Sequence, residues 1–120
     1  MASLVGLFRI CRDSELRHLP SDGRAVTTLL LAYDFGPKGL DGRRPSQFIE
    51  ADLWDKRAED LAQFLRKGRE IHCVIDDVHS VASIRADGTA GSKLIGRANQ
   101  IDLGRRPAQD RREYEQEHAA

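Results

Sequence analysis

The sequence is poor in aromatic residues and has no net charge. Aromatic side chains make up 6% of its 120 residues, with a single tryptophan, and 19 basic residues balance 19 acidic ones. Proteins that hold nucleic acid on a broad basic surface carry a positive excess. The balance therefore argues against a strongly basic nucleic-acid binder, although unlike charges can be segregated so that a zero total hides a basic groove.

Long apolar runs and metal-type spacings are also missing. No run approaches the roughly 20 apolar residues of a membrane span, and the N-terminus lacks a signal-peptide pattern, so we expect a cytoplasmic protein. Cys11 and Cys73 stand alone, and we interpret them as small side chains in or near the core. Without paired histidines, a phosphate loop or a nucleophile motif, we predict no catalysis, no metal and no cofactor.

The chain contains short segments in which apolar and polar residues alternate, as in half-buried strands. Gly6 in the first segment suggests a bulge or bend. Residues 25–33 are interpreted as a strand, although their triple leucine is also compatible with a helix. The predicted strands cover residues 3–12, 25–33, 47–53, 70–78 and 93–103, with a second short extended stretch at 15–19. Asp-Gly turns are predicted at 20–23 and 86–89, and a long exposed connection at 35–46.

One segment has the helical period. Between residues 57 and 66, small and apolar residues recur at i, i+3, i+4 and i+7, with Asp55 as the expected N-cap and Gly68 as the stop. Five strands with one helix between the third and fourth is the order of the OB-fold, a Greek-key β-barrel. We predict a mainly β OB-fold domain over residues 1–103 and a polar, flexible or frayed-helical tail over 104–120.

Three stretches resemble the bacterial single-stranded DNA-binding protein family, to which primosomal replication protein N is related. They are DSELRHLPSDG at residues 13–23, WDKRAEDLAQFLRKG at 54–68 and RADG at 85–88. Their order and separation are those of the family. The resemblance implies an OB-fold, sequence-independent binding of single-stranded DNA in replication, repair or recombination, and a homo-oligomer, either a dimer or a tetramer.

The family binds DNA by stacking bases on aromatic side chains, which is worth roughly 1–3 kcal/mol per base. By the resemblance, Trp54 and Phe48 fall on stacking positions, and Tyr33 or Phe35 could replace an aromatic residue of the long loop. The alternation of its segment directs Phe48 outward. Trp54, at the strand end, is equally compatible with a plug of the barrel core.

Basic residues are the expected phosphate contacts. The resemblance matches Lys56, Arg66 and Lys67 to basic family positions, and the alternation of the last strand puts Lys93 and Arg97 on one face. The remaining candidates in the first strands and the long loop are Arg9, Arg12, Arg17, Arg24, Lys38, Arg43 and Arg44. An ordinary solvated surface is the alternative interpretation of this set.

Several family positions are changed in this sequence. The family's third stacking tryptophan corresponds to about Ser83, its His-Arg pair is Ile49-Glu50 here, and its acidic tail ending in Pro-Phe is not found. Glu50 and Asp52, beside Phe48, repel phosphates. A second hypothesis is therefore an OB-fold accessory protein of replication that contacts other proteins through the Phe48 face and binds DNA weakly.

Overall fold

Six strands wrap around one core in the computed structural model, which describes residues 1–104. The strands are β1 (Leu4–Ile10), β2 (Leu16–His18), β3 (Ala25–Asp34), β4 (Ser46–Trp54), β5 (Glu70–Ile84) and β6 (Ala90–Asp102). The helix α1 (Asp55–Leu61) and the 3₁₀ turn η1 (Ala62–Phe64) join β4 to β5. Apart from Gly104, the predicted tail lies outside the described residues.

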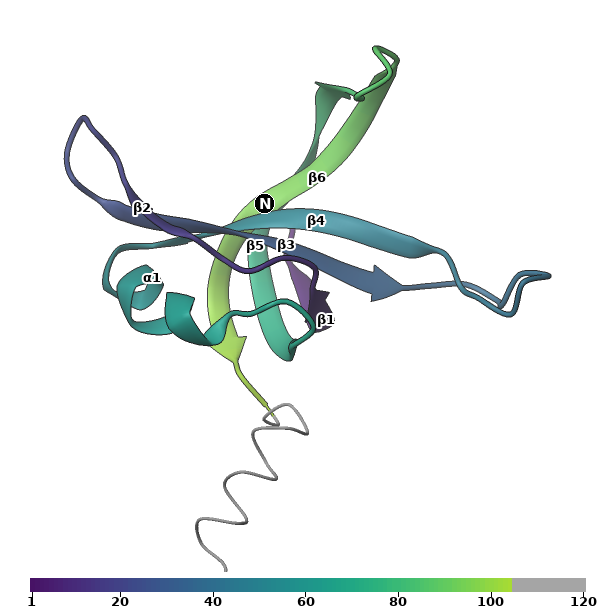
Figure 1. Ribbon diagram of the computed structural model, residues 1–120, viewed down its shortest axis with the longest axis horizontal. Coiled ribbons are helices and arrows are strands. Elements are labelled where there is room, and N and C mark those ends of the chain that lie inside the picture. Colours follow the sequence, from purple (N-terminus) through teal and green to yellow (C-terminus); the bar gives the residue numbers. More distant parts are fainter. Residues whose placement is uncertain (105–120) are drawn as a thin grey trace, which may run out of the picture.

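The sheet closes on itself. Its strand order is β1-β5-β6-β4-β3-β2, and β1 also pairs with β3, which completes the barrel. All pairs are antiparallel except β4 with β6. Because β1 and β2 pair with successive parts of β3, they form one barrel strand that is interrupted at residues 11–15 (Figure 1). Counted in this way, the helix follows the third of five strands, and the predicted OB-fold is confirmed.

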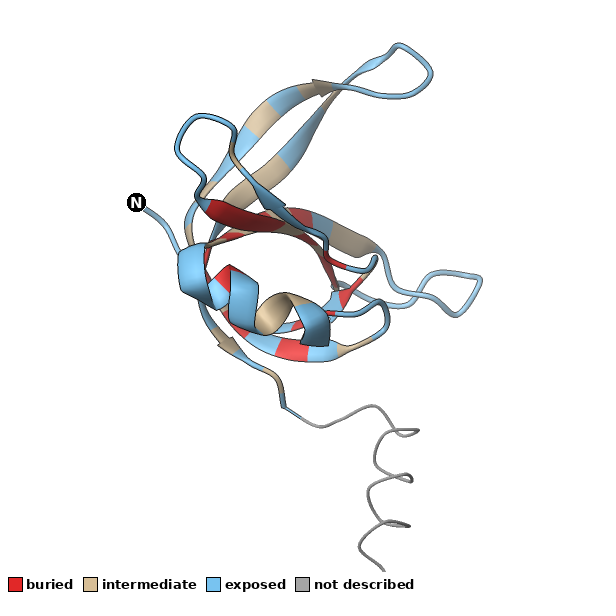
Figure 2. Cartoon of the chain, turned by 60° about the vertical axis from the view of Figure 1, so that its left-hand side comes forward, coloured by how far each residue is buried: buried red, intermediate tan, exposed pale blue. Residues whose placement is uncertain are grey.

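Alternate side chains of β1, β3, β4 and the first half of β5 fill the barrel, and β6 adds Ala98. The triple leucine lies in β3, where Leu29 and Leu31 are buried and Leu30 points to the other face. The helix lies across one open end of the barrel (Figure 2). Of the predicted apolar positions, Ala58 on the helix and Leu65, which follows η1, are fully buried in the core cluster, and Leu61 packs against it. The helix thus covers the end that the strands leave open.

Both cysteines are free thiols at the places that the sequence suggested. Cys73 is buried and Cys11 is partly buried. Burial of the Cys73 thiol raises its pKa to about 11, because a thiolate loses hydration inside an apolar core. The interpretation of the two residues as small core or near-core side chains is confirmed.

The helix boundaries were predicted wrongly. The helix begins after Trp54, which occupies the N-cap position without a side-chain cap bond, and it ends at Leu61 rather than Arg66. Asp55 is not the cap: it has φ 61° and binds Arg24 instead. The chain tightens into η1 before the fully buried Leu65, and Gly68 turns it toward β5, donating its N–H to the carbonyl of Ile10.

Strand lengths and bulges also differ from the prediction. β5 continues to Ile84 and β6 begins at Ala90, because the outer parts of these strands are held by cross-strand pairing and bury too little to show alternation. The bulge expected at Gly6 is wrong, since β1 keeps one register along β5. The irregularities lie instead between β5 and β6, at Val74/Ile75 and Asp76/His79.

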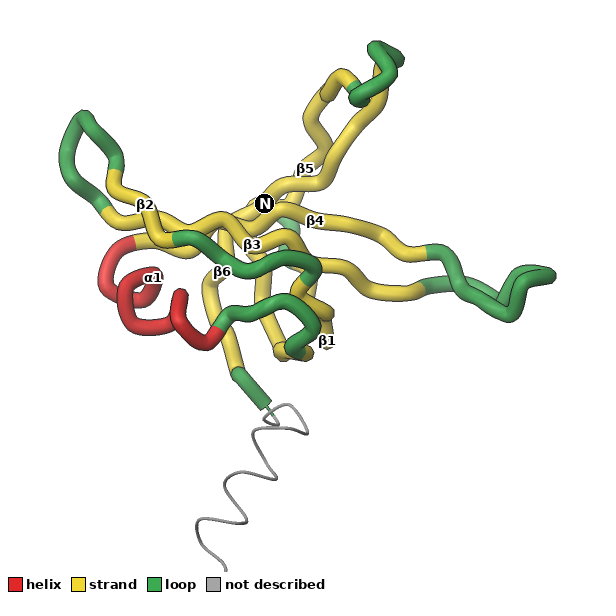
Figure 3. The backbone as a smooth tube through the Cα atoms, viewed as in Figure 1, coloured by secondary structure: helices red, strands yellow, loops and turns green. Residues whose placement is uncertain are grey.

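Three hairpins extend from the barrel, formed by β2–β3, β3–β4 and β5–β6 (Figures 1 and 3). Each tip contains an Asp-Gly pair: the carboxylate accepts a hydrogen bond from the N–H two residues on, and the glycine has positive φ. The predicted turns are confirmed, and they follow from the left-handed conformations that Asp-Gly tolerates. No helix within residues 1–104 is long and apolar enough to span a membrane.

Gly96 marks the crossing, the place where β6 is paired with β5 along one edge and with β4 along the other. It lies beside Ala51 in the parallel pair and opposite the bulge of β5 at Asp77 and Val78. A Cβ atom at Gly96 would lie 2.5 Å from Cγ2 of Ile75 and 2.9 Å from the carbonyl oxygen of Asp76. Both distances are shorter than van der Waals contact, so only glycine fits this crossing without movement of the core.

We expect Gly96→Ala to lower the free energy of unfolding by about 1–3 kcal/mol, the usual cost of overpacking a core. Gly6→Ala is the matched control, because Gly6 also lies in a regular strand but has no heavy atom within 4 Å of its Cβ position. Urea denaturation followed by circular dichroism measures both. Equal stability of the two variants would contradict the close packing at Gly96.

Candidate functional site

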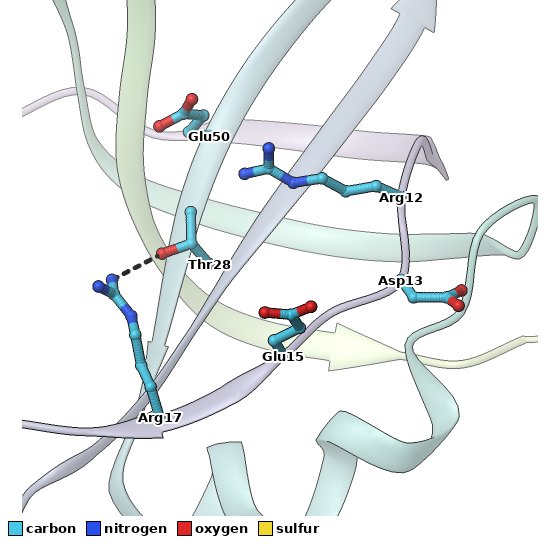
Figure 4. Close-up of a pocket in the computed structure, with 6 residues that line it drawn as sticks. All are labelled: Arg12, Asp13, Glu15, Arg17, Thr28 and Glu50. Atoms are coloured by element: carbon cyan, nitrogen blue, oxygen red, sulfur yellow. Dashed lines mark hydrogen bonds between the residues drawn. The ribbon is translucent and has the colours of Figure 1, made fainter.

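A shallow groove runs over the outer faces of β3, β4 and β6. It consists of two adjoining hollows of about 470 and 460 Å³ that share Arg17, Thr28 and Glu50. The segment between β1 and β2 forms one wall, and the base of the β5–β6 hairpin forms the other. Figure 4 shows the first hollow, with the guanidinium end of Arg12 extending over the strands toward Thr28 and Glu50.

The floor of the groove follows the outward row of β4. This row contains Phe48, Glu50, Asp52 and Trp54, and it alternates with the buried Ile49, Ala51 and Leu53. The predicted outward direction of Phe48 is confirmed, with 50% of its surface exposed. A strand rises about 3.3 Å per residue, so the two aromatic side chains lie about 20 Å apart along the groove, with the two carboxylates between them.

The neighbouring strands fix what each carboxylate meets. Asp52 lies between Thr28 on β3 and Arg97 on β6, whereas Glu50 lies between Leu30 and Ile95. Thr28 Oγ1 donates to Asp52 Oδ1 at 2.7 Å and accepts a hydrogen bond from Arg17 Nη2 at 3.2 Å (Figure 4). The carboxylate of Asp52 is thus tied into a network that reaches the wall of the groove.

Glu50 is paired on one side only. Its Oε2 atom lies 3.3 Å from Lys93 Nζ, and the Glu50 side chain is 31% exposed. Within residues 1–104 the other carboxylate oxygen, Oε1, has no hydrogen-bond partner. The open hollow therefore contains a negatively charged oxygen that can still accept a hydrogen bond.

The charge of the groove is mixed. Five acidic side chains face four basic ones across the two hollows. The acidic residues are Asp13, Glu15, Glu50, Asp52 and Asp77; the basic ones are Arg12, Arg17, Lys93 and Arg97. The basic residues come from both walls and the acidic ones also occupy the floor, so a polyanion would be attracted at the edges of the groove and repelled at its centre.

Trp54 ends the floor next to an ion pair. The guanidinium of Arg24 lies 4.7 Å from the centre of the Trp54 ring and binds both carboxylate oxygens of Asp55, at 3.0 and 2.9 Å. These bonds lower the pKa of the Asp55 carboxyl group and raise that of Arg24. Trp54 is half-buried, lines the groove and is not one of the buried core residues, so the alternative of a barrel plug does not describe its position.

The structure brings together five of the sixteen residues predicted to bind DNA. Arg12, Arg17, Trp54, Lys93 and Arg97 line the groove, and Phe48 extends its floor row. Arg24 lies on Trp54. These seven positions form a continuous set around β4 and the crossing of β6.

The other predicted residues lie away from the two hollows. Phe35, Lys38, Arg43 and Arg44 are on the exposed β3–β4 loop. Arg9 lies 3.8 Å from Asp34 at the base of that loop, and Arg66 lies 3.8 Å from Asp13. Lys56 and Lys67 are exposed at the two ends of the helical segment. Tyr33 packs edge-on against the buried Phe8 and so faces the core.

Several residues of the groove were not among the predicted DNA contacts. Thr28, Asp77, His79 and Ile95 line the hollows. The alternation of β6 could have pointed to Ile95, which shares a face with Lys93 and Arg97. The alternation of β5 does not identify Asp77 or His79, because the bulge between Asp76 and His79 changes the face to which the side chains point.

Comparisons with known proteins agree with this geometry. The family model described as "Single-strand binding protein family" matches residues 2–74. The chain is similar to the Single-stranded DNA-binding protein 1 of Lactococcus lactis (45% identity over 65 residues, 54% of this chain and 41% of the relative). It is also similar to the Single-stranded DNA-binding protein of Clostridium tetani (38% over 71 residues, 59% and 48%) and that of Streptococcus mutans (43% over 65 residues, 54% and 38%). In each case the aligned part spans less than half of the relative.

We expect the Asp55 carboxyl to titrate below its ordinary value of 3.8, because the hydrogen bonds from Arg24 favour the ionised form. Replacing Arg24→Gln should return the pKa to the ordinary range. A folded-state pKa below the unfolded one stabilises the fold above the unfolded value, and this stabilisation is lost as the pH falls through the folded value. Carbon-detected NMR titration of the aspartates measures the shift; an Asp55 pKa that is the same in both proteins would contradict the pairing.

Proposed function

Because the chain belongs to the single-strand binding protein family, we propose that its groove binds single-stranded DNA without reading a defined sequence. The observation that carries this proposal is the β4 row, which presents Phe48 and Trp54 to an open groove with basic residues on both walls. Aromatic side chains accept any base by stacking, and cations at the edges of a groove suit phosphates. The names of the similar relatives favour this function over an accessory protein that acts only through protein contacts.

The proposed mode of binding is stacking with limited help from charge. Each stacked base contributes roughly 1–3 kcal/mol, whereas the acidic floor cancels part of the phosphate attraction. We therefore propose a non-catalytic protein of the cytoplasm that protects or holds exposed single strands during replication, repair or recombination. Phe35, Lys38, Arg43 and Arg44 on the long loop are the proposed contacts for a strand that continues beyond Phe48.

We expect a mixed-sequence oligonucleotide to quench the fluorescence of Trp54, the only tryptophan, as a base stacks on it. Phe48→Ala and Trp54→Ala should each weaken binding by about 5- to 100-fold, the equivalent of one lost stack. Fluorescence anisotropy of a labelled oligonucleotide measures all variants. Phe64→Ala is the matched control, because Phe64 is similarly exposed and does not line the groove. Absence of binding at low salt would refute the proposal.

The salt dependence of binding should be shallow. A single strand too short to continue beyond Phe48 to the long loop meets only the four basic residues of the groove. It gives a slope of log K against log[salt] no steeper than about −3, at roughly 0.7 per phosphate contact. The acidic floor keeps the slope small, since part of each positive charge is already neutralised. Anisotropy titrations at several salt concentrations give this slope, and a markedly steeper value would place the DNA on the basic β3–β4 loop instead.

A homo-oligomer, dimer or tetramer, is the second part of the proposal. It is supported by β1, whose residues Leu4–Phe8 pair with β5 on one side and, among the described strands, with none on the other. Val5 and Leu7 are 59% and 60% exposed on its outer face. An open strand edge with apolar side chains is a surface that pairs readily with another chain.

We expect light scattering on the full chain to give at least a dimer, and Val5→Lys with Leu7→Lys to shift the mass toward the monomer, because the two charges would be buried without partners. The same substitutions at the solvent-facing Leu40 and Ile84 serve as the control. A monomeric wild-type chain, or an oligomer that the β1 substitutions leave intact, would contradict this assignment of the interface.

A further inference from the structure

One carboxylate on the groove floor has hydrogen-bonding capacity that the fold does not use. Asp52 is bonded to Thr28 and lies beside Arg97. Glu50 shares only Oε2 with Lys93, at 3.3 Å, and remains 31% exposed. Since Glu50 lines both hollows, its carboxylate lies in the middle of the path that a ligand would take.

The position of Glu50 determines which part of a nucleotide reaches it. Bases stacked on Phe48 and Trp54 would lie about 20 Å apart, since a strand rises about 3.3 Å per residue. They are therefore not consecutive bases, and the nucleotides between them must cross Glu50. The negative floor repels phosphates, while the basic side chains of both walls attract them. The backbone is thus directed to the walls, and base edges are directed to the floor.

The neighbours of Glu50 in the sheet leave its second oxygen available. In the register of the sheet these neighbours are Leu30 on β3 and Ile95 on β6. Their side chains have no hydrogen-bonding groups, so they do not compete with a base for this oxygen. Glu50 therefore differs from Asp52, whose carboxylate is bonded to Thr28.

An ionised carboxylate accepts hydrogen bonds and donates none. The exocyclic amino groups of cytosine and adenine are donors, and acidic side chains accept from cytosine N4. The O4 oxygen of thymine or uracil is an acceptor, which a carboxylate repels. Resting on the single-stranded DNA binding proposed above, we propose that Glu50 makes the groove select bases that carry an exocyclic amino group over thymine, as a preference added to sequence-tolerant stacking.

The test compares oligo(dC) with oligo(dU) of equal length at mildly alkaline pH, where cytosine is uncharged. Cytosine has an amino group at C4 and an unprotonated N3, whereas uracil has an oxo group at C4 and an N3–H. Neither base has the methyl group of thymine, so the comparison is not affected by it. We expect oligo(dC) to bind the full chain about tenfold more tightly, the range of one good base contact. Glu50→Gln should bring the two affinities within about twofold, because an amide both donates and accepts.

Asp52→Asn is the matched control, since it removes the same charge from the same row but from a carboxylate that is already bonded. It should raise both affinities and keep the ratio between the two oligonucleotides. A wild-type ratio within about twofold, or a ratio that Glu50→Gln leaves unchanged, would overturn the inference while leaving DNA binding intact. Failure of both oligonucleotides to bind at low salt would instead overturn the proposed function, and this inference with it.

Discussion

The groove depends on how the barrel closes. β6 pairs with β5 from Ala90 to Asp102 and, around Gly96, also pairs in parallel with β4 on its other edge. This crossing leaves no room for a side chain, because Ile75 and the backbone of Asp76 occupy the space. Close approach of the two strands brings the outward residues of β6 next to those of β4. Lys93 meets Glu50 and Arg97 meets Asp52 for this reason alone.

Pairing of opposite charges gives this surface an ordered but weakly charged floor. Arg17 is held through Thr28 by Asp52, and Lys93 is held by Glu50. Because these two basic side chains are already held in place, they lose less entropy when they bind a ligand. The acidic group that holds each of them also competes with the ligand for its charge. The groove is thus well ordered but attracts a polyanion weakly at long range. In the proposed mode of DNA binding, stacking on Phe48 and Trp54 would therefore provide most of the binding energy.

The local period of the chain explains what the sequence could predict. Inward residues of β1, β3 and β4 follow from alternation, and the burial of Ala58 follows from the helical period, because burial repeats with each. The helix end could not be foreseen, since η1 is set by the distance that Leu65 must cover to reach the core. The outer part of the β5–β6 hairpin extends beyond the core. Neither face of it is buried there, so apolar and polar residues have no reason to alternate.

In the groove, too, the direction of a side chain within one strand could be predicted, but the pairing of strands far apart in the chain could not. Phe48 could be placed on the outward row from sequence alone, and Lys93 and Arg97 on one face, whereas Trp54 stayed open between the groove and the core. That the two rows are adjacent follows from the parallel pairing of strands separated by some forty residues in the chain. The bulge that brings Asp77 and His79 to the groove depends on the Gly96 crossing, and it leaves Asp77 with a φ of 54° that its residue type does not require.

Asp55, a residue with a strained backbone, is linked to Trp54 through Arg24. A non-glycine residue with φ 61° is energetically unfavourable, although aspartate tolerates this region better than most. Its carboxylate keeps the Arg24 guanidinium against one face of Trp54. An exposed ion pair adds little to stability, so the effect of the arrangement is geometric. With one face of the indole ring occupied by the chain's own cation, Trp54 has one face left for a base, and a strand that stacks there meets a fixed positive charge at the end of the groove.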